Sequence, residues 1–268
     1  MIRVMVGEDI YFPGDPDVMR YNLQQAFRES PVTSEDAAVT VAPFGAYRHS
    51  LPYIAGSLKA MGTKRPDRII ILAPPDSNSA GDVMLPESDR FATPLGTLPV
   101  ETDTLEELRR RSRYFVNDEI AHLQNHSIEV LLPAVHYYFG CVPILPLLIP
   151  RLTIDQLTPV TDAIASIQIP GETRILVGAN LSGFAPPREA EGTARMMIRL
   201  LMTARGTGIT GNIATFENPP RSAWPLALGH ILAGETTRPH ILSRGNFETE
   251  YEGNAGTVVF ASIAYIRG

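Results

Sequence analysis

Three short apolar runs constrain the fold of this chain more than any other feature of its sequence. Each run is rich in β-branched residues and is followed at once by Pro, Gly or small polar residues; with their loops, the runs occupy residues 39–47, 68–77 and 174–184. Continuous apolar runs of this length are typical of parallel strands that are buried on both faces. Helical patterns alternate with the runs along the chain. The sequence therefore predicts an α/β fold, with a central, mainly parallel or mixed sheet flanked by helices.

The other expected elements follow from capping signals and apolar periodicity. Asp15 precedes Pro16 and predicts a helix start, and Thr153 opens a capping box. Further helices are expected over residues 50–61, from residue 102, and over 125–139, 153–166, 191–204 and 223–233. Further strands are expected over residues 142–148 and 256–266, and residues 78–101 are expected to form short elements joined by turns. No linker interrupts this series, so one domain is expected over residues 1–268.

Composition argues against several classes of function. The 268 residues carry a net charge of −6, whereas a nucleic-acid or anionic-membrane partner requires a basic surface. The longest apolar run, residues 141–150, is too short for a membrane helix and contains prolines. The single cysteine, Cys141, excludes an internal disulfide and a metal site made of several thiolates. The amino terminus lacks the pattern of a signal peptide, so we expect a cytoplasmic protein.

The loops that follow the three apolar runs are the candidate ligand site, because the carboxyl ends of parallel strands form the ligand crevice of open α/β sheets. These loops contain Phe44, Asp76, Ser77, Asn180 and Ser182, and neither His nor Cys stands in their first three positions. Turns stabilised by short polar side chains explain the polar members equally well. The sequence therefore predicts a crevice without the usual catalytic residues.

Residues 125–133, Asn-His-Ser-Ile-Glu-Val-Leu-Leu-Pro, resemble a motif of the Memo family, in which the leading position is Glu instead of Asn125. The family is related to the class III extradiol dioxygenases, and its bacterial members are known as AmmeMemoRadiSam system protein B. Residues 7–16, 93–96 and 142–145 resemble further family motifs in the same order, so the similarity extends over nearly the whole chain. The resemblance implies a Memo-like fold and a crevice in which relatives hold a metal.

The positions that correspond to the family's metal ligands carry other residues in this chain. By resemblance, Phe44 replaces a histidine, residues 76–77 replace two histidines, residues 178–183 lose an acid and a histidine, and residues 221–225 lack a cysteine. A divalent metal needs about three imidazole, thiolate or carboxylate ligands together, and only Asp76 remains. The resemblance therefore implies a degenerate member with no metal and no cofactor.

The histidines allow two interpretations. His122, His126 and Glu129 would share one face of a continuous helix and form a metal site, but Asn125 and Ser127 are natural N-caps that favour a helix start between the histidines. We therefore expect His126 and Glu129 to form a buried hydrogen-bonded pair that could transfer protons.

The leading functional hypothesis is a non-catalytic, Memo-like protein whose crevice binds a small molecule or a protein partner. Phe44 and Trp224 are expected to approach one another there, with Tyr47, His49 and Arg221 nearby; alternatively, the two aromatic rings fill the cavity of the lost metal.

The alternative function is a non-haem metal-dependent oxidoreductase of the extradiol type with a rebuilt site. Its ligands would be Asp76, His49 and His126, with Glu129 supporting them. The strand over residues 256–266 is apolar on both faces, so it must be buried in a sheet or covered by a partner. Because extradiol-type relatives commonly assemble, the resemblance also implies a homodimer or other oligomer.

Overall fold

The computed structural model describes residues 1–77, 80–216, 218–251 and 254–268, and an eight-stranded mixed sheet forms its centre. The strand order is β10-β11-β2-β9-β3-β8-β4-β7. The middle strands run parallel to one another; they are β2 (Val39–Ala42), β9 (Thr173–Gly178), β3 (Arg68–Ala73) and β8 (Ile144–Leu148). Nearly all of their side chains are buried, which confirms the inference from the continuous apolar runs.

Antiparallel pairs extend this parallel centre on both sides. β11 (Asn254–Arg267) pairs with β2, and β10 (Thr237–Tyr251) pairs with β11 to make a long hairpin. On the other side, β4 (Val83–Leu85) runs antiparallel to β8, and β7 (Phe115–Asn117) lies parallel to β4. The sheet is therefore mixed, with its parallel strands in the interior, and the expected fold class is confirmed.

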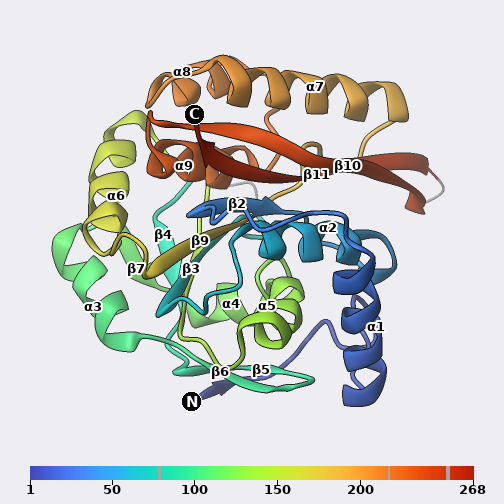
Figure 1. The fold of residues 1–268 in the computed structure, drawn as a ribbon. Coiled ribbons are helices and arrows are strands. Elements are labelled where there is room, and N and C mark those ends of the chain that lie inside the picture. Colours follow the sequence, from blue (N-terminus) through green and yellow to red (C-terminus); the bar gives the residue numbers. More distant parts are fainter. Residues whose placement is uncertain (78–79, 217, 252–253) are drawn as a thin grey trace.

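A second, three-stranded sheet lies beside the amino terminus (Figure 1). It consists of β1 (Ile2–Arg3), β5 (Arg90–Thr93) and β6 (Gly96–Pro99). β5 and β6 form a hairpin whose turn is the Thr-Pro-Leu-Gly segment at residues 93–96. The region expected to hold short elements joined by turns thus contains, in its described residues 80–101, the three short strands β4, β5 and β6.

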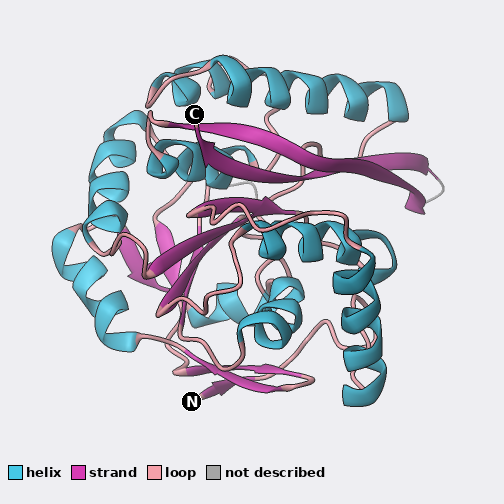
Figure 2. Ribbon diagram, in the orientation of Figure 1, coloured by secondary structure: helices cyan, strands magenta, loops and turns pink. Residues whose placement is uncertain are grey.

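Helices cover both faces of the large sheet (Figures 1 and 2). One side carries α1 (Pro16–Glu29), α2 (Tyr47–Ala60) and α5 (Leu132–Phe139), and the other carries α7 (Pro187–Thr203), α8 (Gly208–Ile213) and α9 (Ala223–Ala233). The remaining helical segments are α3 (Thr102–Arg111), α4 (Glu119–Gln124), the 3-10 turn η1 (Glu129–Leu131) and α6 (Ile154–Ser166). None of the helices in the described ranges has the length and apolar character that crossing a membrane requires.

Two capping signals correctly predicted where a helix begins, at α1 and at α6. The Asp15 carboxylate accepts hydrogen bonds from the backbone N–H groups of Asp17 and Val18 at the start of α1, both at 2.9 Å. The capping box of Thr153 is present at the start of α6. α7 begins at Pro187 instead of residue 191, because a proline at the first helical position needs no hydrogen-bond partner for its nitrogen.

The apolar strand β11 is covered within the chain itself. Its edges pair with β10 and β2, and α7 and α2 pack against it. Its apolar residues are therefore buried within the chain, and the expected oligomer stays a prediction.

Candidate functional site

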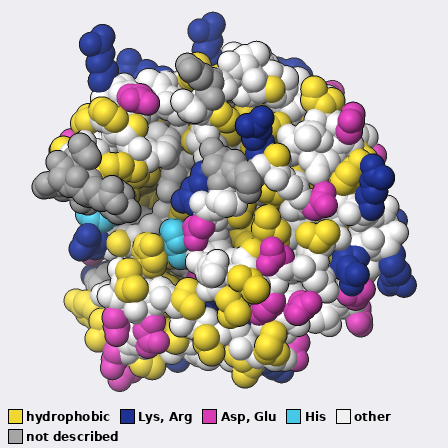
Figure 3. All heavy atoms as spheres, turned by 180° about the vertical axis from the view of Figure 1, so that it is seen from behind, with side chains coloured by type: hydrophobic (Ala, Val, Ile, Leu, Met, Phe, Trp, Pro, Cys, Tyr) yellow, Lys and Arg dark blue, Asp and Glu magenta, His cyan; other side chains and the backbone are white. Residues whose placement is uncertain are grey.

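A cavity of about 560 Å³ lies at the carboxyl ends of β2 and β9. We call it the strand-end cavity; it is lined by residues 10–11, 44–46, 48–49, 126, 180, 182–184, 221–222, 247 and 258. Its walls come from the loops after the two strands, the amino end of α2, the segment before α9 and the β10–β11 hairpin. This is the edge of the sheet at which the crevice was expected. Figure 3 shows one face of the molecule with a hollow, around which histidine side chains lie beside basic and acidic ones.

Asn180 and Ser182 hold the cavity walls together. The Asn180 side chain accepts a hydrogen bond from the backbone N–H of Phe44 at 3.3 Å and donates one to the carbonyl oxygen of Phe44 at 3.0 Å. The hydroxyl oxygen of Ser182 accepts a hydrogen bond from the backbone N–H of Val259 at 2.9 Å. Both side chains are buried, so they join the loops after β2 and β9 and the strand β11.

His126 and Arg221 line the cavity, and Asp76, which lies beside it, joins them in a polar cluster. The Asp76 carboxylate lies 3.5 Å from Nδ1 of His126 and 3.1 Å from Nη1 of Arg221. Arg221 also donates to the backbone carbonyl oxygens of Pro75 and Asp76, at 3.0 and 2.8 Å, and so fixes the loop after β3. The ring of Tyr11 stacks on the imidazole, with 4.4 Å between centroids. Three loops that are distant in sequence therefore meet at one carboxylate.

Burial lowers the pKa of His126, and the Arg221 cation adds to this effect, whereas the Asp76 carboxylate opposes it. The imidazole is therefore neutral at pH 7 and can accept a proton. Asp76 would stabilise the imidazolium that forms. Chemically, this arrangement could move a proton on a molecule held in the cavity.

Glu129 does not form the expected pair with His126. Its Oε1 accepts hydrogen bonds from the backbone N–H groups of Val6 and Gly7, at 2.8 and 2.9 Å, and its Oε2 lies 2.7 Å from Nη1 of Arg3. The carboxylate thus anchors the amino-terminal segment, and Asp76 is the acid that contacts His126. The prediction was wrong because it used sequence proximity alone, whereas β1 brings Arg3 beside η1.

The expected interruption of the helix between His122 and His126 is found, but Asn125 and Ser127 do not cap the next helix, which starts at η1 and α5 instead of at residue 125. α4 ends at Gln124, and the chain is non-helical until η1. Asn125 and Ser127 both donate to the backbone carbonyl oxygen of Pro74, at 3.0 and 2.8 Å. The motif around His126 therefore holds the loop after β3 in place.

Tyr47, Ser77 and Trp224 lie outside the strand-end cavity. Tyr47 is buried in α2, where burial raises the pKa of its hydroxyl, and Ser77 is exposed. Trp224 lines a different cavity of about 300 Å³ together with Phe216. The expected approach of Phe44 to Trp224 is therefore not found, because α9 directs the indole toward α6 and α8.

Comparisons with known proteins place the chain in a family. The family model described as Memo-like protein matches residues 7–213. This chain belongs to the Memo-like protein family. A MEMO1 family protein of Nitrosopumilus maritimus is 24% identical over 209 residues, 75% of this chain and 76% of that protein. A MEMO1 family protein of Methanopyrus kandleri is 22% identical over 276 residues, 96% of each chain. The crystal structure of an uncharacterized protein from Escherichia coli K12 matches with a TM-score of 0.47 and 12% identity, covering 83% of this chain and 98% of that chain.

The donors in this Memo-like chain do not fit a metal. Among the residues that the structure describes, no group of three or more His, Cys, Asp or Glu side chains is placed to hold an ion. Asp76 and His126 are in contact, but His49 stacks on Phe247 with 4.8 Å between centroids, and Glu129 is bound to Arg3. The ligand set that the oxidoreductase alternative requires is therefore not assembled there.

Several residues that line the cavity of this Memo-like protein were not singled out from the sequence, among them Tyr11, Arg48 and Phe247. Tyr11 belongs to the segment 7–16 that resembles a family motif, so this motif could have identified it as a site residue. Arg48 stands between two residues that were singled out, Tyr47 and His49. Phe247 lies on β10, a strand that the sequence analysis did not predict.

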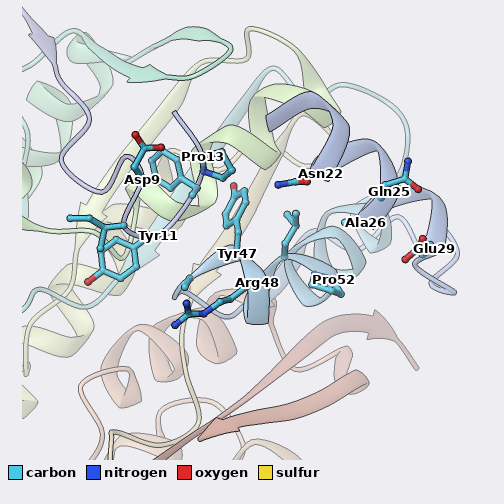
Figure 4. A pocket seen from close by; sticks show the side chains of 14 residues that line it. Asp9, Tyr11, Pro13, Asn22, Gln25, Ala26, Glu29, Tyr47, Arg48 and Pro52 are labelled. Atoms are coloured by element: carbon cyan, nitrogen blue, oxygen red, sulfur yellow. The ribbon is translucent and has the colours of Figure 1, made fainter. Parts of the chain in front are cut away.

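Tyr11 and Arg48 also line a second hollow, a groove of about 570 Å³ between the amino-terminal loop, α1 and α2. We call it the helix groove; Figure 4 shows its lining side chains, which include Asp9, Tyr47 and Glu29. In this view the Arg48 side chain extends from α2 toward Tyr11, and both residues line the groove as well as the strand-end cavity.

Proposed function

We propose that this Memo-like protein binds a small organic molecule in the strand-end cavity and does so without a metal. The observation that supports this proposal is the cavity itself: about 560 Å³ of space at the carboxyl ends of the parallel strands. Cavities of roughly 300–1,000 Å³ with mainly apolar walls and a few polar groups are typical of small-molecule sites. Phe44, Phe184 and Phe247 supply apolar surface, and His126 and Arg221 supply polar groups that would orient a ligand.

The proposal is tested by filling the cavity from Gly183. A Cβ atom built on this residue meets no atom within 4 Å, and its backbone does not have a positive φ, so a larger side chain can be added without strain. We expect wild-type protein to bind N-phenyl-1-naphthylamine or its sulfonate, 8-anilino-1-naphthalenesulfonate, at one saturable site. Gly183→Leu should weaken this binding at least about tenfold, because the isobutyl group occupies the space of the probe.

Gly192→Leu is the matched control, since Gly192 is exposed on α7 and its Cβ also meets no atom within 4 Å. Probe fluorescence should titrate as in the wild type. If neither probe binds, or if both leucine variants behave alike, the proposed function is wrong.

The competing oxidoreductase requires a bound metal. We expect protein purified without chelators to contain much less than one iron, copper or zinc ion per chain, measured by plasma mass spectrometry, because the donors described above do not converge. Stoichiometric metal that is lost in both Asp76→Ala and His126→Ala, with the melting temperature retained, would support the oxidoreductase instead.

A further inference from the structure

The ionisable side chains that line the strand-end cavity are basic, whereas the chain as a whole is acidic. The chain carries a net charge of −6. None of the lining residues that the structure describes is acidic, whereas Arg48, Arg221, His49 and His126 all line the cavity. Asp76 lies beside the cavity but pairs with Arg221, and the imidazoles add no charge, so the lining keeps the uncompensated positive charge of Arg48, which favours an anion.

The two arginines differ in how far they are neutralised. Arg221 forms an ion pair with Asp76 at 3.1 Å and also binds two backbone carbonyls. Arg48 has no ion pair with a carboxylate among the described residues. Its Nε donates a hydrogen bond to Nε2 of His49 at 2.9 Å. Because that nitrogen must be unprotonated to accept, the imidazole adds no charge, and the Arg48 guanidinium keeps free N–H groups for a ligand.

The apolar part of the lining consists largely of aromatic rings. Phe247 stacks on His49, with an interplanar angle of 11°, and Tyr11 stacks on His126, with an angle of 3°. Phe44 meets the edge of the His126 ring, with 5.9 Å between centroids. Ring faces and edges of this kind pack well against a flat apolar body.

We infer that the ligand of this cavity is an organic anion, with a ring-sized apolar body against the aromatic walls and its carboxylate or similar group on Arg48. This inference rests on the proposed function and adds the chemical class of the ligand. Arg48 is the anchoring residue because its charge is not already used by a carboxylate. Arg221 contributes less, since Asp76 compensates its charge.

The test compares two compounds of nearly the same shape, the anion 2-naphthoate and the neutral 2-naphthamide, by isothermal titration calorimetry. We expect wild-type protein to bind the anion about tenfold more tightly than the neutral amide, because a hydrogen bond to a charged partner is stronger. Arg48→Met should remove most of this difference and leave the affinity for 2-naphthamide nearly unchanged. Arg48→Lys should restore part of the difference, since it restores the charge.

Arg199→Met is the control, because Arg199 is exposed on α7 and does not line the cavity. It should retain the full preference for the anion. Equal affinities for 2-naphthoate and 2-naphthamide in the wild type, or a preference that persists in Arg48→Met, would overturn the inference while the proposed function stands. If 2-naphthoate fails to bind at about 1 mM while the fluorescent probes bind, the inference also falls; if the probes fail too, the proposed function falls with it.

Discussion

Replacing Glu129 by Gln is expected to lower the free energy of unfolding by about 3–5 kcal/mol, because it leaves a buried cation without its anion. Arg3 and Glu129 are each only 1% exposed, and their Nη1 and Oε2 atoms are 2.7 Å apart. The amide oxygen of the introduced glutamine can still accept from Val6 and Gly7, so the variant mainly removes the charge. Urea denaturation at pH 7 measures the loss.

Arg3 has further partners that raise the cost of removing its counterion. Its Nε and Nη2 donate to the backbone carbonyl oxygens of His122 and Asn125, at 2.8 and 2.7 Å, and its guanidinium lies 5.2 Å from the ring centroid of Phe91. These contacts hold the side chain in place, so it cannot turn to solvent when the carboxylate is neutralised. The pair thereby joins β1 to the segment that carries His126.

Glu107→Gln is the matched control, because Glu107 pairs with Arg111 on the exposed surface of α3. That variant should change the free energy of unfolding by less than about 1 kcal/mol, as is usual for exposed pairs. The double variant Arg3→Met/Glu129→Leu should lose less stability than the sum of the single changes, since no unpaired charge remains. A loss below about 1 kcal/mol in Glu129→Gln would show that water or a rearrangement compensates the arginine.

The main strands and the longer helices could be predicted from the sequence because local signals and burial agree there. The runs that form β2, β3 and β9 are apolar throughout, and such segments have few alternatives to a buried parallel sheet. β10 lacks this signal: its sequence mixes Arg, Pro, Gly and Glu with scattered apolar residues, as an edge strand with one solvated side allows. It is a strand because its backbone pairs with β11, which is a long-range property.

The site could be predicted only in part, because some of its contacts join residues that are distant in sequence. Strand ends identified the loops of Phe44, Asp76 and Asn180, because topology brings the ends of parallel strands to one edge. The partner of Glu129 could not be predicted, since Arg3 is 126 positions away and reaches it only through the pairing of β1 with β5. Likewise, Trp224 is close to Arg221 in sequence, yet the two side chains line different cavities, because α9 begins between them.

His122 should make the protein less stable as the pH falls. The ring is 2% exposed, and its Nε2 lies 3.0 Å from the carbonyl oxygen of Met84. Burial, assisted by the Arg3 cation, lowers the pKa of this imidazole to about 4, although the hydrogen bond to Met84 opposes the shift. In the unfolded chain the same group takes up its proton near its usual pKa of about 6.5.

The free energy of unfolding falls with pH because the folded and unfolded states bind the His122 proton at different pH values. Above pH 6.5 neither state holds the proton, so the buried neutral ring does not lower the free energy of unfolding. Between about pH 6.5 and 4 the unfolded chain binds a proton that the folded chain does not. The free energy of unfolding therefore falls by roughly 1.4 kcal/mol per pH unit, or about 3 kcal/mol in total. Other partly buried histidines add to the decline, so the His122 share is obtained by comparison with a variant.

His122→Gln isolates that share, because the glutamine amide does not titrate and can still donate to Met84. At pH 7.5 we expect the variant to be about 1 kcal/mol less stable than the wild type, owing to imperfect packing. At pH 4.5 the order should reverse, since only the wild type has lost the histidine contribution. His240→Gln, at an exposed position of β10, should follow the wild-type curve, because it leaves the buried His122 ring in place. Parallel curves for wild type and His122→Gln from pH 7.5 to 4.5 would mean that the buried ring also binds its proton in the folded state. The imidazolium would then donate to a rearranged carbonyl oxygen or lie beside a carboxylate such as Asp118 or Glu119, which already act to raise its pKa.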